Sequence, residues 1–388
     1  MLHSINRLFI FFLSILILNS STISAQNGLK LKYKNSVVYS GIEVGSKGVK
    51  ISLLELGQDA KKSGAFNILK DSSINTDFIS FTASSFENTL KALTDFYNYA
   101  ATNFKIPKER IFTVVSSGVK IQAEKEHRMN EVNQLIDSFK VRIGNPARAV
   151  PVIDVQQEAI LSHLGIVPDS RRYSTFLIDI GSGNSKGGYF FNTNTKDFKL
   201  FQLSWGSKST ANATEKRCEE DKSLANYYKQ LNRTLAGAEQ SEIIYRVNES
   251  GGYPMSDYIA FSGGISWAIA TLISPELVNN SVVPVTYDDI VKFSERIYRN
   301  YSTLSDASIT AAITDKSVDK TVVAREVKRV NGVFDQRTLM AGTGLLLKVM
   351  RQFEGIYEKK EFYLVKNGQV GWISAYVDES IKNSSVSK

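Results

Sequence analysis

The sequence is poor in the residues that build disulfide frameworks and metal centres. It has one cysteine, Cys218, and three histidines among 388 residues. A single cysteine cannot form an internal disulfide, and it lacks the partners of a thiolate metal site. Neither a Ser-His-Asp arrangement nor a metal-binding spacing of histidines is present. The fold must therefore be stabilised by a hydrophobic core, for which 43% apolar residues provide the material.

Long apolar runs are scarce as well. The exception is residues 8–18, which are apolar apart from Ser14, follow Arg7 and precede the "ISA" before Gln26. This three-part pattern is typical of a secretory signal peptide that is cleaved near Ala25. The run is too short to span a bilayer comfortably, so an uncleaved anchor is the weaker alternative. We expect an exported, periplasmic or extracellular protein with no transmembrane segment after removal of this leader (residues 1–25).

Acidic residues are outnumbered by basic ones. The formal net charge is +8, and removal of Arg7 with the leader leaves +7. A basic exported protein attracts polyanions such as phosphate chains, nucleotides or acidic membrane surfaces. A generically basic secreted surface explains the charge equally well.

Strand-like and helix-like segments alternate along the mature chain. The first cycle predicts strands at 36–45, 49–56, 110–118 and 148–155, and helices at 86–104, 123–139 and 156–167. The second cycle predicts a hairpin at 174–191, a strand at 198–207, a strand, turn and helix at 258–273, helices at 288–301, 317–327 and 339–357, and a strand and helix at 361–377. Such alternation indicates an α/β protein. We expect two domains, 36–157 and 158–377, with a helical insertion at about 210–247 and a loose tail at 378–388.

The most informative feature is an internal sequence repeat. The stretches "YSGIEVGSKGVKISLLEL" and "FLIDIGSGNSKGGYFF" share one pattern: an apolar strand, an acid, a small-residue turn with a lysine, and a second strand. Their acids, Glu43 and Asp179, occupy the same point of each unit. Two copies of one supersecondary unit indicate duplicated half-domains that face each other.

The two turns have the composition of phosphate-binding loops. Glycine lets the backbone approach a ligand closely, and consecutive N–H groups in such a turn converge on anionic oxygens. A carboxylate beside a phosphate is tolerable when Mg²⁺ lies between them, so Glu43 and Asp179 are the candidate metal ligands. An ordinary hairpin with a capping acid is the alternative for either turn alone. The candidate phosphate-binding residues of the turns are Gly45, Ser46, Lys47, Gly181, Ser182, Gly183 and Asn184.

Two further positions complete the candidate site. Gly263 and Gly264 lie between a predicted strand and helix, where a helix N-terminus can hold an anion. Glu158, in "VQQEAILSHLG", shortly precedes the strand of Asp179 and is a candidate general base for an attacking water. A surface helix glutamate is the alternative. His163, on the same helix, is interpreted as a structural or surface residue and not as a ligand.

These motifs, in their order and spacing, resemble the exopolyphosphatase/guanosine pentaphosphate phosphohydrolase family of the sugar kinase–heat-shock-protein–actin superfold. The resemblance covers about residues 38–376 and includes "IAFSGGISWAIA", "LMAGTGLLLKVM" and "LVKNGQVGWISAY". It implies two ribonuclease-H-like domains with an interdomain cleft, a Mg²⁺ cofactor, and polyphosphate or a nucleoside polyphosphate as the partner. We expect no nucleic-acid partner, and we consider a homodimer.

Carried over residue by residue, the resemblance assigns Glu158 as the catalytic base and Asp179, with Glu43 as its counterpart, to Mg²⁺. Lys120 stands where the family has a phosphate-contacting arginine. The sequence also departs from the family: Ser182 replaces the middle glycine of three, Lys47-Gly48 replaces Asn-Ser, and Lys186 replaces a glutamate that helps to hold water or metal. A lysine there is expected to strengthen polyanion binding and weaken metal-assisted hydrolysis.

Three functions follow from these observations. The first is an exported phosphoanhydride hydrolase that releases terminal phosphate by Mg²⁺-assisted water attack in the interdomain cleft. The second is a catalytically weakened or inactive relative that binds polyphosphate or a nucleotide, or acts as a scaffold. The third is an actin-like assembling protein, against which the Glu158 helix pattern argues.

Overall fold

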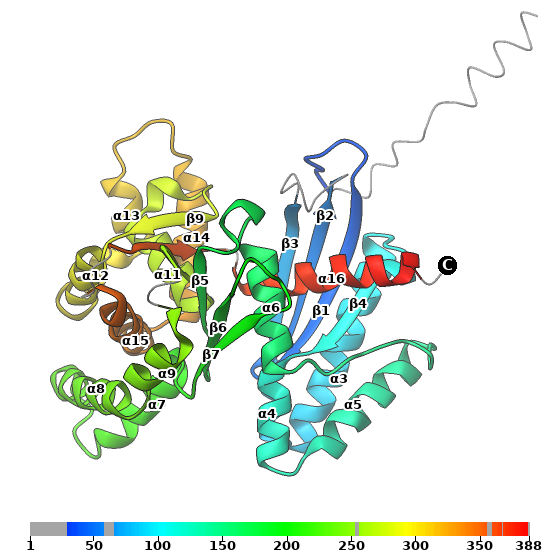
Figure 1. Cartoon of the computed structure of the whole chain (residues 1–388), viewed down its shortest axis with the longest axis horizontal. Helices are drawn as coiled ribbons and strands as arrows, with labels where there is room; N and C mark the ends of the chain where they lie inside the picture. The colour runs from blue at the N-terminus through cyan, green and yellow to red at the C-terminus, as the bar shows by residue number, and fades with distance from the viewer. Residues whose placement is uncertain (1–28, 58–65, 253–255, 355–358, 367, 387–388) are drawn as a thin grey trace, which may run out of the picture.

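Two lobes, each built around a β-sheet, make up the part of the chain that the computed structural model describes: residues 29–57, 66–252, 256–354, 359–366 and 368–386 (Figure 1). The predicted signal peptide and its cleavage site lie outside these residues. The strands are β1 (Val37–Gly45), β2 (Gly48–Leu56), β3 (Phe66–Asn75), β4 (Ile111–Val115), β5 (Thr175–Ile180), β6 (Ser185–Phe190), β7 (Phe198–Leu203), β8 (Tyr258–Ser262), β9 (Val282–Val285) and β10 (Glu361–Val365).

The two sheets repeat one topology. The first has the order β3-β2-β1-β4, and the second has the order β7-β6-β5-β8-β10-β9. In each, three consecutive strands pair antiparallel, and the next strand then pairs parallel with the first of the three. The first sheet gains one further parallel bridge, between Val115 and Val152. The predicted α/β fold of two duplicated ribonuclease-H-like domains is therefore confirmed.

The helices flank these sheets, and several of them begin at side-chain caps. Thr82 and Ser85 form a capping box at α3, and the Asp154 side chain accepts the Gln157 amide at the start of α6. No helix among the described residues is long and apolar enough to cross a membrane. The helices are α3 (Ala83–Asn98), α4 (Ser117–Lys125), α5 (Met129–Arg142), α6 (Val155–Ile166), α7 (Ser207–Arg217), α8 (Leu224–Ala238), α9 (Ile244–Ser250), α11 (Gly264–Ile273), α12 (Tyr287–Arg299), α13 (Asp306–Ala312), α14 (Lys320–Val333), α15 (Gln336–Glu354) and α16 (Gly368–Val386).

Three local predictions in the first lobe are corrected. The helix expected at 123–139 is divided between α4 and α5, because His127 has a φ of 58°, which a continuous right-handed helix does not allow. The strand expected at 110–118 ends at Val115, and α4 begins two residues later. The strand expected at 148–155 contributes only the bridge at Val152, so it barely extends the sheet.

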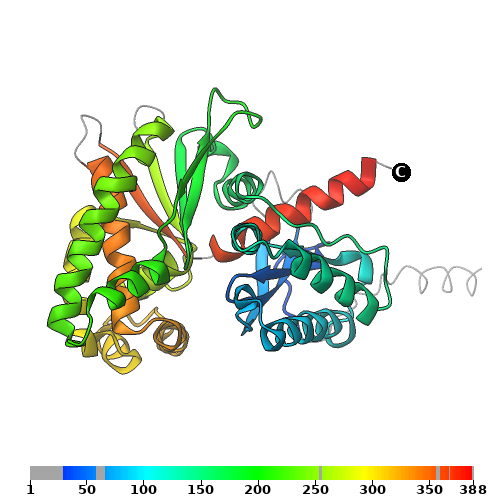
Figure 2. The ribbon, with the colours of Figure 1, turned by 90° about the horizontal axis from the view of Figure 1, so that it is seen from below.

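The last helix joins the first lobe, although its sequence follows the second. α16 runs across the face of the first sheet and packs against α6 and β1 (Figures 1 and 2). Its Trp372 and Ile373 share a buried cluster with Val114 of β4. The tail predicted to be loose continues this helix as far as Val386. The expected domain at 158–377 therefore differs from the structure at its C-terminal end, because α16 packs on the first lobe.

The contact between α6 and α16 is made possible by two glycines. A Cβ atom on Gly165 would lie 2.0 Å from the carbonyl oxygen of Gly371, which is far inside van der Waals contact. The two backbones therefore touch, and no larger residue fits at this crossing. This crossing lies between the two sheets and connects the lobes.

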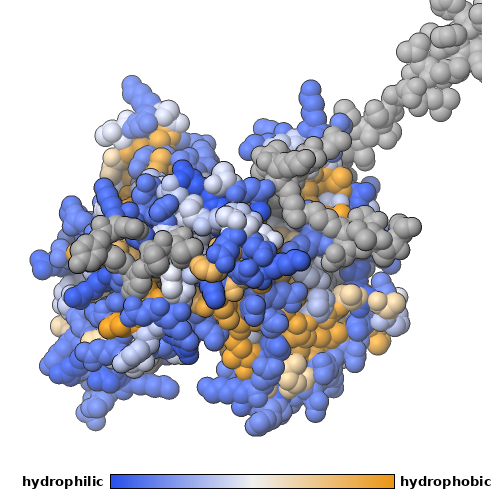
Figure 3. Space-filling view, in the orientation of Figure 1, coloured by the Kyte–Doolittle hydropathy of each residue, from blue (hydrophilic) through white to orange (hydrophobic). Residues whose placement is uncertain are grey.

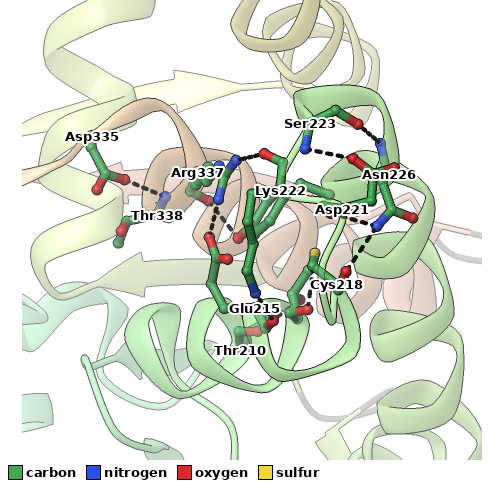
Figure 4. Close-up of polar contacts among 12 residues, drawn as sticks. Thr210, Glu215, Cys218, Asp221, Lys222, Ser223, Asn226, Asp335, Arg337 and Thr338 are labelled. Carbon is green, nitrogen blue, oxygen red and sulfur yellow. Dashed lines mark hydrogen bonds and ion pairs between the residues drawn. The ribbon is translucent and has the colours of Figure 1, made fainter.

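The segment at about 210–247, which was expected to be a helical insertion, is helical and forms α7 to α9. Arg337 at the start of α15 holds it: one guanidinium nitrogen lies 2.6 Å from Glu215, and another donates to the Lys222 carbonyl (Figure 4). Asn226 donates to the carbonyls of Cys218 and Asp221 in the same network. These bonds fix the insertion to the body of the second lobe.

His163 is a core residue, which decides between the structural and the surface position that the sequence left open. Its side chain is fully buried between the rings of Phe190 and Phe198, and Nε2 lies 3.0 Å from the Thr175 carbonyl oxygen. A carbonyl can only accept, so Nε2 carries the proton of a neutral ring. Burial lowers the pKa of His163 to about 4.

We predict that Gly165→Ala destabilises the protein by about 1–3 kcal/mol, because the added methyl group overpacks the crossing of α6 and α16. Gly237→Ala in α8 is the matched control, since a Cβ atom there meets nothing within 4 Å. The control should be neutral or slightly stabilising. Chemical denaturation of the three proteins measures the difference. Equal stability of the Gly165 variant and wild type would show that the crossing is not tight.

We predict that His163 makes the stability pH-dependent. Its folded pKa of about 4 lies below the ordinary 6.5, so the unfolded chain binds the proton first as the pH falls. The contribution is complete above pH 6.5 and is lost towards pH 4, with an upper limit of about 3 kcal/mol. His163→Gln should flatten the stability profile in this window, whereas the exposed His127→Gln should not. Denaturation series across the window test this, and parallel profiles for wild type and His163→Gln would contradict it.

Candidate functional site

The two acids at the hairpin tips share one site. In the strand register, Glu43 of β1 lies opposite Lys50 of β2, and Asp179 of β5 lies opposite Lys186 of β6. Burial raises the pKa of Glu43, which also responds to the charges of Lys186 and Asp179 from the other lobe. The duplicated hairpins therefore bring their acids together across the lobes.

Lys186 forms an ion pair with Glu158 and is also affected by the charges of Asp179 and Glu43. Its Nζ is 2.6 Å from Oε1 of Glu158, and the two side chains are only 12% and 4% exposed. Burial alone would lower the pKa of Lys186, but the carboxylates of Glu158, Asp179 and Glu43 outweigh burial and hold its pKa above the ordinary value. The ammonium group is thus a fixed positive charge among three carboxylates.

Glu158 is engaged through both of its oxygens. Lys186 occupies Oε1, and Oε2 accepts the backbone amide of Ser117 at 2.9 Å, at the first turn of α4. Burial raises the pKa of Glu158, but the charge of Lys186 and these hydrogen bonds outweigh it, so the pKa lies below the ordinary value. A carboxylate held in this way is a weak proton acceptor. The same contacts link Ser117 of the first lobe to Lys186 of the second.

The second glycine turn rests against α7. The carbonyl of Gly181 accepts the Ser207 amide at 2.9 Å, and the carbonyl of Ser182 accepts the Lys208 amide at 2.9 Å. In a trans peptide the carbonyl and the following N–H point in opposite directions. The amides of Ser182 and Gly183 therefore point away from α7, as an anion-binding turn requires. The Gly181 amide closes the turn by donating to the carbonyl of Asn184 at 3.0 Å.

Lysines from both lobes lie near the first turn. Lys47, between Gly45 and Gly48, has a pKa lowered by burial and then by the charges of Lys208 and Lys50. Lys208 belongs to α7, so its influence shows that the two lobes approach each other here. Ser46 lies against α4, where its Oγ would be 2.7 Å from a Cβ atom on Gly118. Lys50 and Lys208 thus add positive charge near the first turn, and Asp77 partly opposes it.

The third glycine position abuts the second acid. Gly263 has a φ of 94°, and a Cβ atom there would lie 2.4 Å from the carbonyl oxygen of Ile180. Its neighbour Ser262 donates from Oγ to Asp179 at 2.9 Å. Gly264 makes only ordinary contact, with Phe334. Gly263 is therefore required by packing at this position, and it lies beside the site.

Lys120 was expected to contact phosphate, but it pairs with an acid of its own helix. Its Nζ lies 3.7 Å from Glu124 on the same helix. Lys50 and Lys208, by contrast, were not identified from the sequence. A signal for Lys50 exists, because it follows Glu43 by seven residues, the separation that also joins Asp179 to Lys186.

The arrangement of donors disfavours the Mg²⁺ that the sequence led us to expect. The search of the described residues finds no group of three or more His, Cys, Asp or Glu side chains placed to hold a metal ion. More directly, the ammonium of Lys186 stands among Glu43, Glu158 and Asp179. A divalent cation drawn to these carboxylates would meet a buried positive charge. The acids and the cation already form a charge-paired cluster.

A second contact joins the lobes away from this cluster. Arg329 of α14 lies 3.1 Å from Asp71 of β3, across a groove of about 300 Å³. Asn67 of β3 and Trp267 of α11 also line it. The surface is indented between the two lobes (Figure 3). This groove therefore lies between the lobes and has mostly polar walls.

The sequence matches no protein-family model. A search of curated proteins likewise finds no match. Solved structures are similar over most of the chain. A crystal structure of the Aquifex aeolicus Ppx/GppA family member has a TM-score of 0.60 and 17% identity, covering 90% of this chain and 99% of that one. The type II variant of the Aquifex aeolicus Ppx/GppA phosphatase has a TM-score of 0.58 and 17% identity, covering 87% and 99%. A Cytophaga hutchinsonii exopolyphosphatase has a TM-score of 0.52 and 13% identity, covering 88% and 98%.

These likenesses extend over nearly the whole length of the other chains, so the two-lobed fold is shared from end to end. They agree with the fold expected from the acid-tipped hairpins. At such low identity they show the fold alone, and the chemistry of the cleft depends on the residues that this chain places there.

Proposed function

We propose that the protein binds the phosphate chain of polyphosphate or a nucleoside polyphosphate in the interlobe cleft, and that it does so as a binding protein. One observation carries this proposal: both carboxylate oxygens of Glu158 are occupied, one by Lys186 and one by the Ser117 amide. The residue expected to activate water is therefore held as a structural carboxylate.

The cleft supplies what a phosphate chain needs. Lys47 and Lys50 from the first hairpin and Lys208 from α7 lie close enough for their charges to affect one another. The amides of Ser182 and Gly183 point away from α7 and provide donors for phosphoryl oxygens. Several charge-assisted hydrogen bonds along a flexible anion give affinity without a requirement for one terminal group. The ligand class is thus a linear polyanion.

Hydrolysis is the second candidate function. The electrostatic influence of Glu158 and Asp179 on Glu43 favours it, as do the names of structures with the same fold, a phosphatase and an exopolyphosphatase. For this function Lys186 would have to transfer its hydrogen bond from Glu158 to a phosphoryl oxygen. Glu158 would then be free to accept a proton from water. If Mg²⁺ binds, Glu43 and Asp179 are the residues that would hold it, and it would neutralise charge on the phosphate.

The leader predicted from residues 1–25 supports a location outside the cytoplasm. We propose that the mature protein meets its ligand in the periplasm or outside the cell. Linear phosphate chains, unlike a specific cytoplasmic nucleotide, fit a cleft whose recognition rests on charge.

We predict that the wild-type protein binds polyphosphate but releases no phosphate above background from polyphosphate or from nucleoside tri- and pentaphosphates with Mg²⁺ present. Glu158→Gln should leave this absence of release unchanged. Colorimetric phosphate assays and isothermal titration measure the two properties. Mg²⁺-dependent release that Glu158→Gln abolishes would make the protein a hydrolase and reject the binding-protein proposal.

The location of the ligand is tested separately. Lys47→Met and Lys208→Met should each weaken polyphosphate binding by about threefold to tenfold, the usual worth of one partly exposed charge. Lys292→Met is the matched control, because this exposed lysine of α12 pairs with Asp288 on its own helix. Equal affinities in all four proteins would place the ligand elsewhere.

A further inference from the structure

We infer that the Lys186 ammonium is a built-in cation that does the work of a metal ion in this cleft, so that phosphate chains bind without any divalent metal. The inference rests on the proposed phosphate-chain binding and adds how the charge of the site is balanced. It concerns one side chain of β6 and the three acids around it.

The placement of Lys186 follows from the hairpin register. The residue pairs directly with Asp179 across β5 and β6, so the two side chains lie on the same face of the sheet. The side chain is long enough to pass Asp179 and reach Glu158 at 2.6 Å. Glu43 completes the surrounding charge from the first lobe. A metal that linked these acids to a phosphate would need the same space.

Mg²⁺ demands a near-octahedral shell of oxygens and keeps water in it. Each oxygen of Glu158 already has one partner, Lys186 or Ser117, and the adjacent ammonium would repel a second cation bound there. The ammonium, by contrast, has three donors and can keep its bond to Glu158 while it donates to a phosphoryl oxygen. Lysine also binds phosphate as a point charge elsewhere in proteins. The donor set therefore suits an anion next to an ammonium, not an anion next to a metal.

The first hairpin contains a corresponding pair of an acid and a lysine, which is more exposed to solvent. Lys50 lies opposite Glu43 in the register, and its Nζ is 3.9 Å from Oε2 of Glu43. The Lys50 side chain is 45% exposed, whereas that of Lys186 is 12% exposed. An acid and a lysine at the same separation in both halves are part of the duplicated unit. The pair around Lys186 lies at the base of the site, and the pair around Lys50 lies nearer its mouth.

The first experiment uses the full wild-type chain with tripolyphosphate as the probe. Isothermal titration in the presence of EDTA, and then with Mg²⁺ at equal ionic strength, should give affinities within about threefold of each other. Binding that disappears in EDTA and returns with Mg²⁺ would overturn the inference and leave the proposed function standing. Absence of binding in both conditions would reject the proposed function and the inference with it.

The second experiment changes the cation itself. Lys186→Met should weaken tripolyphosphate binding in EDTA at least tenfold, whereas Lys292→Met should not change it. Lys186→Glu should gain a site for Mn²⁺ alone, read by the electron paramagnetic resonance of the free ion, at least tenfold tighter than in wild type. Unchanged tripolyphosphate affinity in Lys186→Met, or tight Mn²⁺ binding by wild type, would overturn the inference. Circular dichroism confirms folding, and the wild-type titrations decide the matter if a variant does not fold.

Discussion

The buried ion pair between Lys186 and Glu158 is the interaction on which the site depends. The charges of Glu43, Glu158 and Asp179, which come from two lobes, act on Lys186, and without this cation the acids would repel one another. Removal of one partner of a buried pair typically costs about 3–5 kcal/mol, because the other charge is left without compensation. Glu158 also accepts the Ser117 amide, so the pair ties the first turn of α4 to β6. The lobes are thereby held at the distance at which their turns can face a common ligand.

Most of the fold could be predicted from local sequence patterns, because most of its strands and helices have a recognisable hydrophobic periodicity. The two acid-tipped hairpins alternate apolar residues and end in glycine turns, and both lie where expected. β3 was missed because "FNILKDSSIN" has too few apolar residues to indicate a strand; its place comes from pairing with β2. The break at His127 was missed because a left-handed residue leaves no mark in the hydrophobic period. The lobe to which α16 belongs depends on contacts more than 200 residues away in sequence, which no local pattern encodes.

The candidate site, like the fold, could be predicted only in part from the sequence. Glu43, Asp179, Glu158 and the unusual Lys186 could be named from the chain alone, because each occupies a recognisable point of a motif. The bond that decides what Glu158 can do could not, since Ser117 and Lys186 reach it from different lobes. A shared fold fixes the positions of such groups. One side chain, Lys186, can then determine whether the Glu158 carboxylate accepts a proton or the ammonium binds the anion. Chains at 13% to 17% identity can therefore keep one architecture and differ in chemistry.

The return of α16 to the first lobe also sets an order of assembly. Leu54 and Leu56 of β2 are covered by Val377, and Val114 of β4 is covered by Trp372 and Ile373. The first lobe is therefore synthesised early but completed last, when the end of the chain has arrived. Contacts of such long sequence separation form slowly. Until then one face of its sheet stays uncovered.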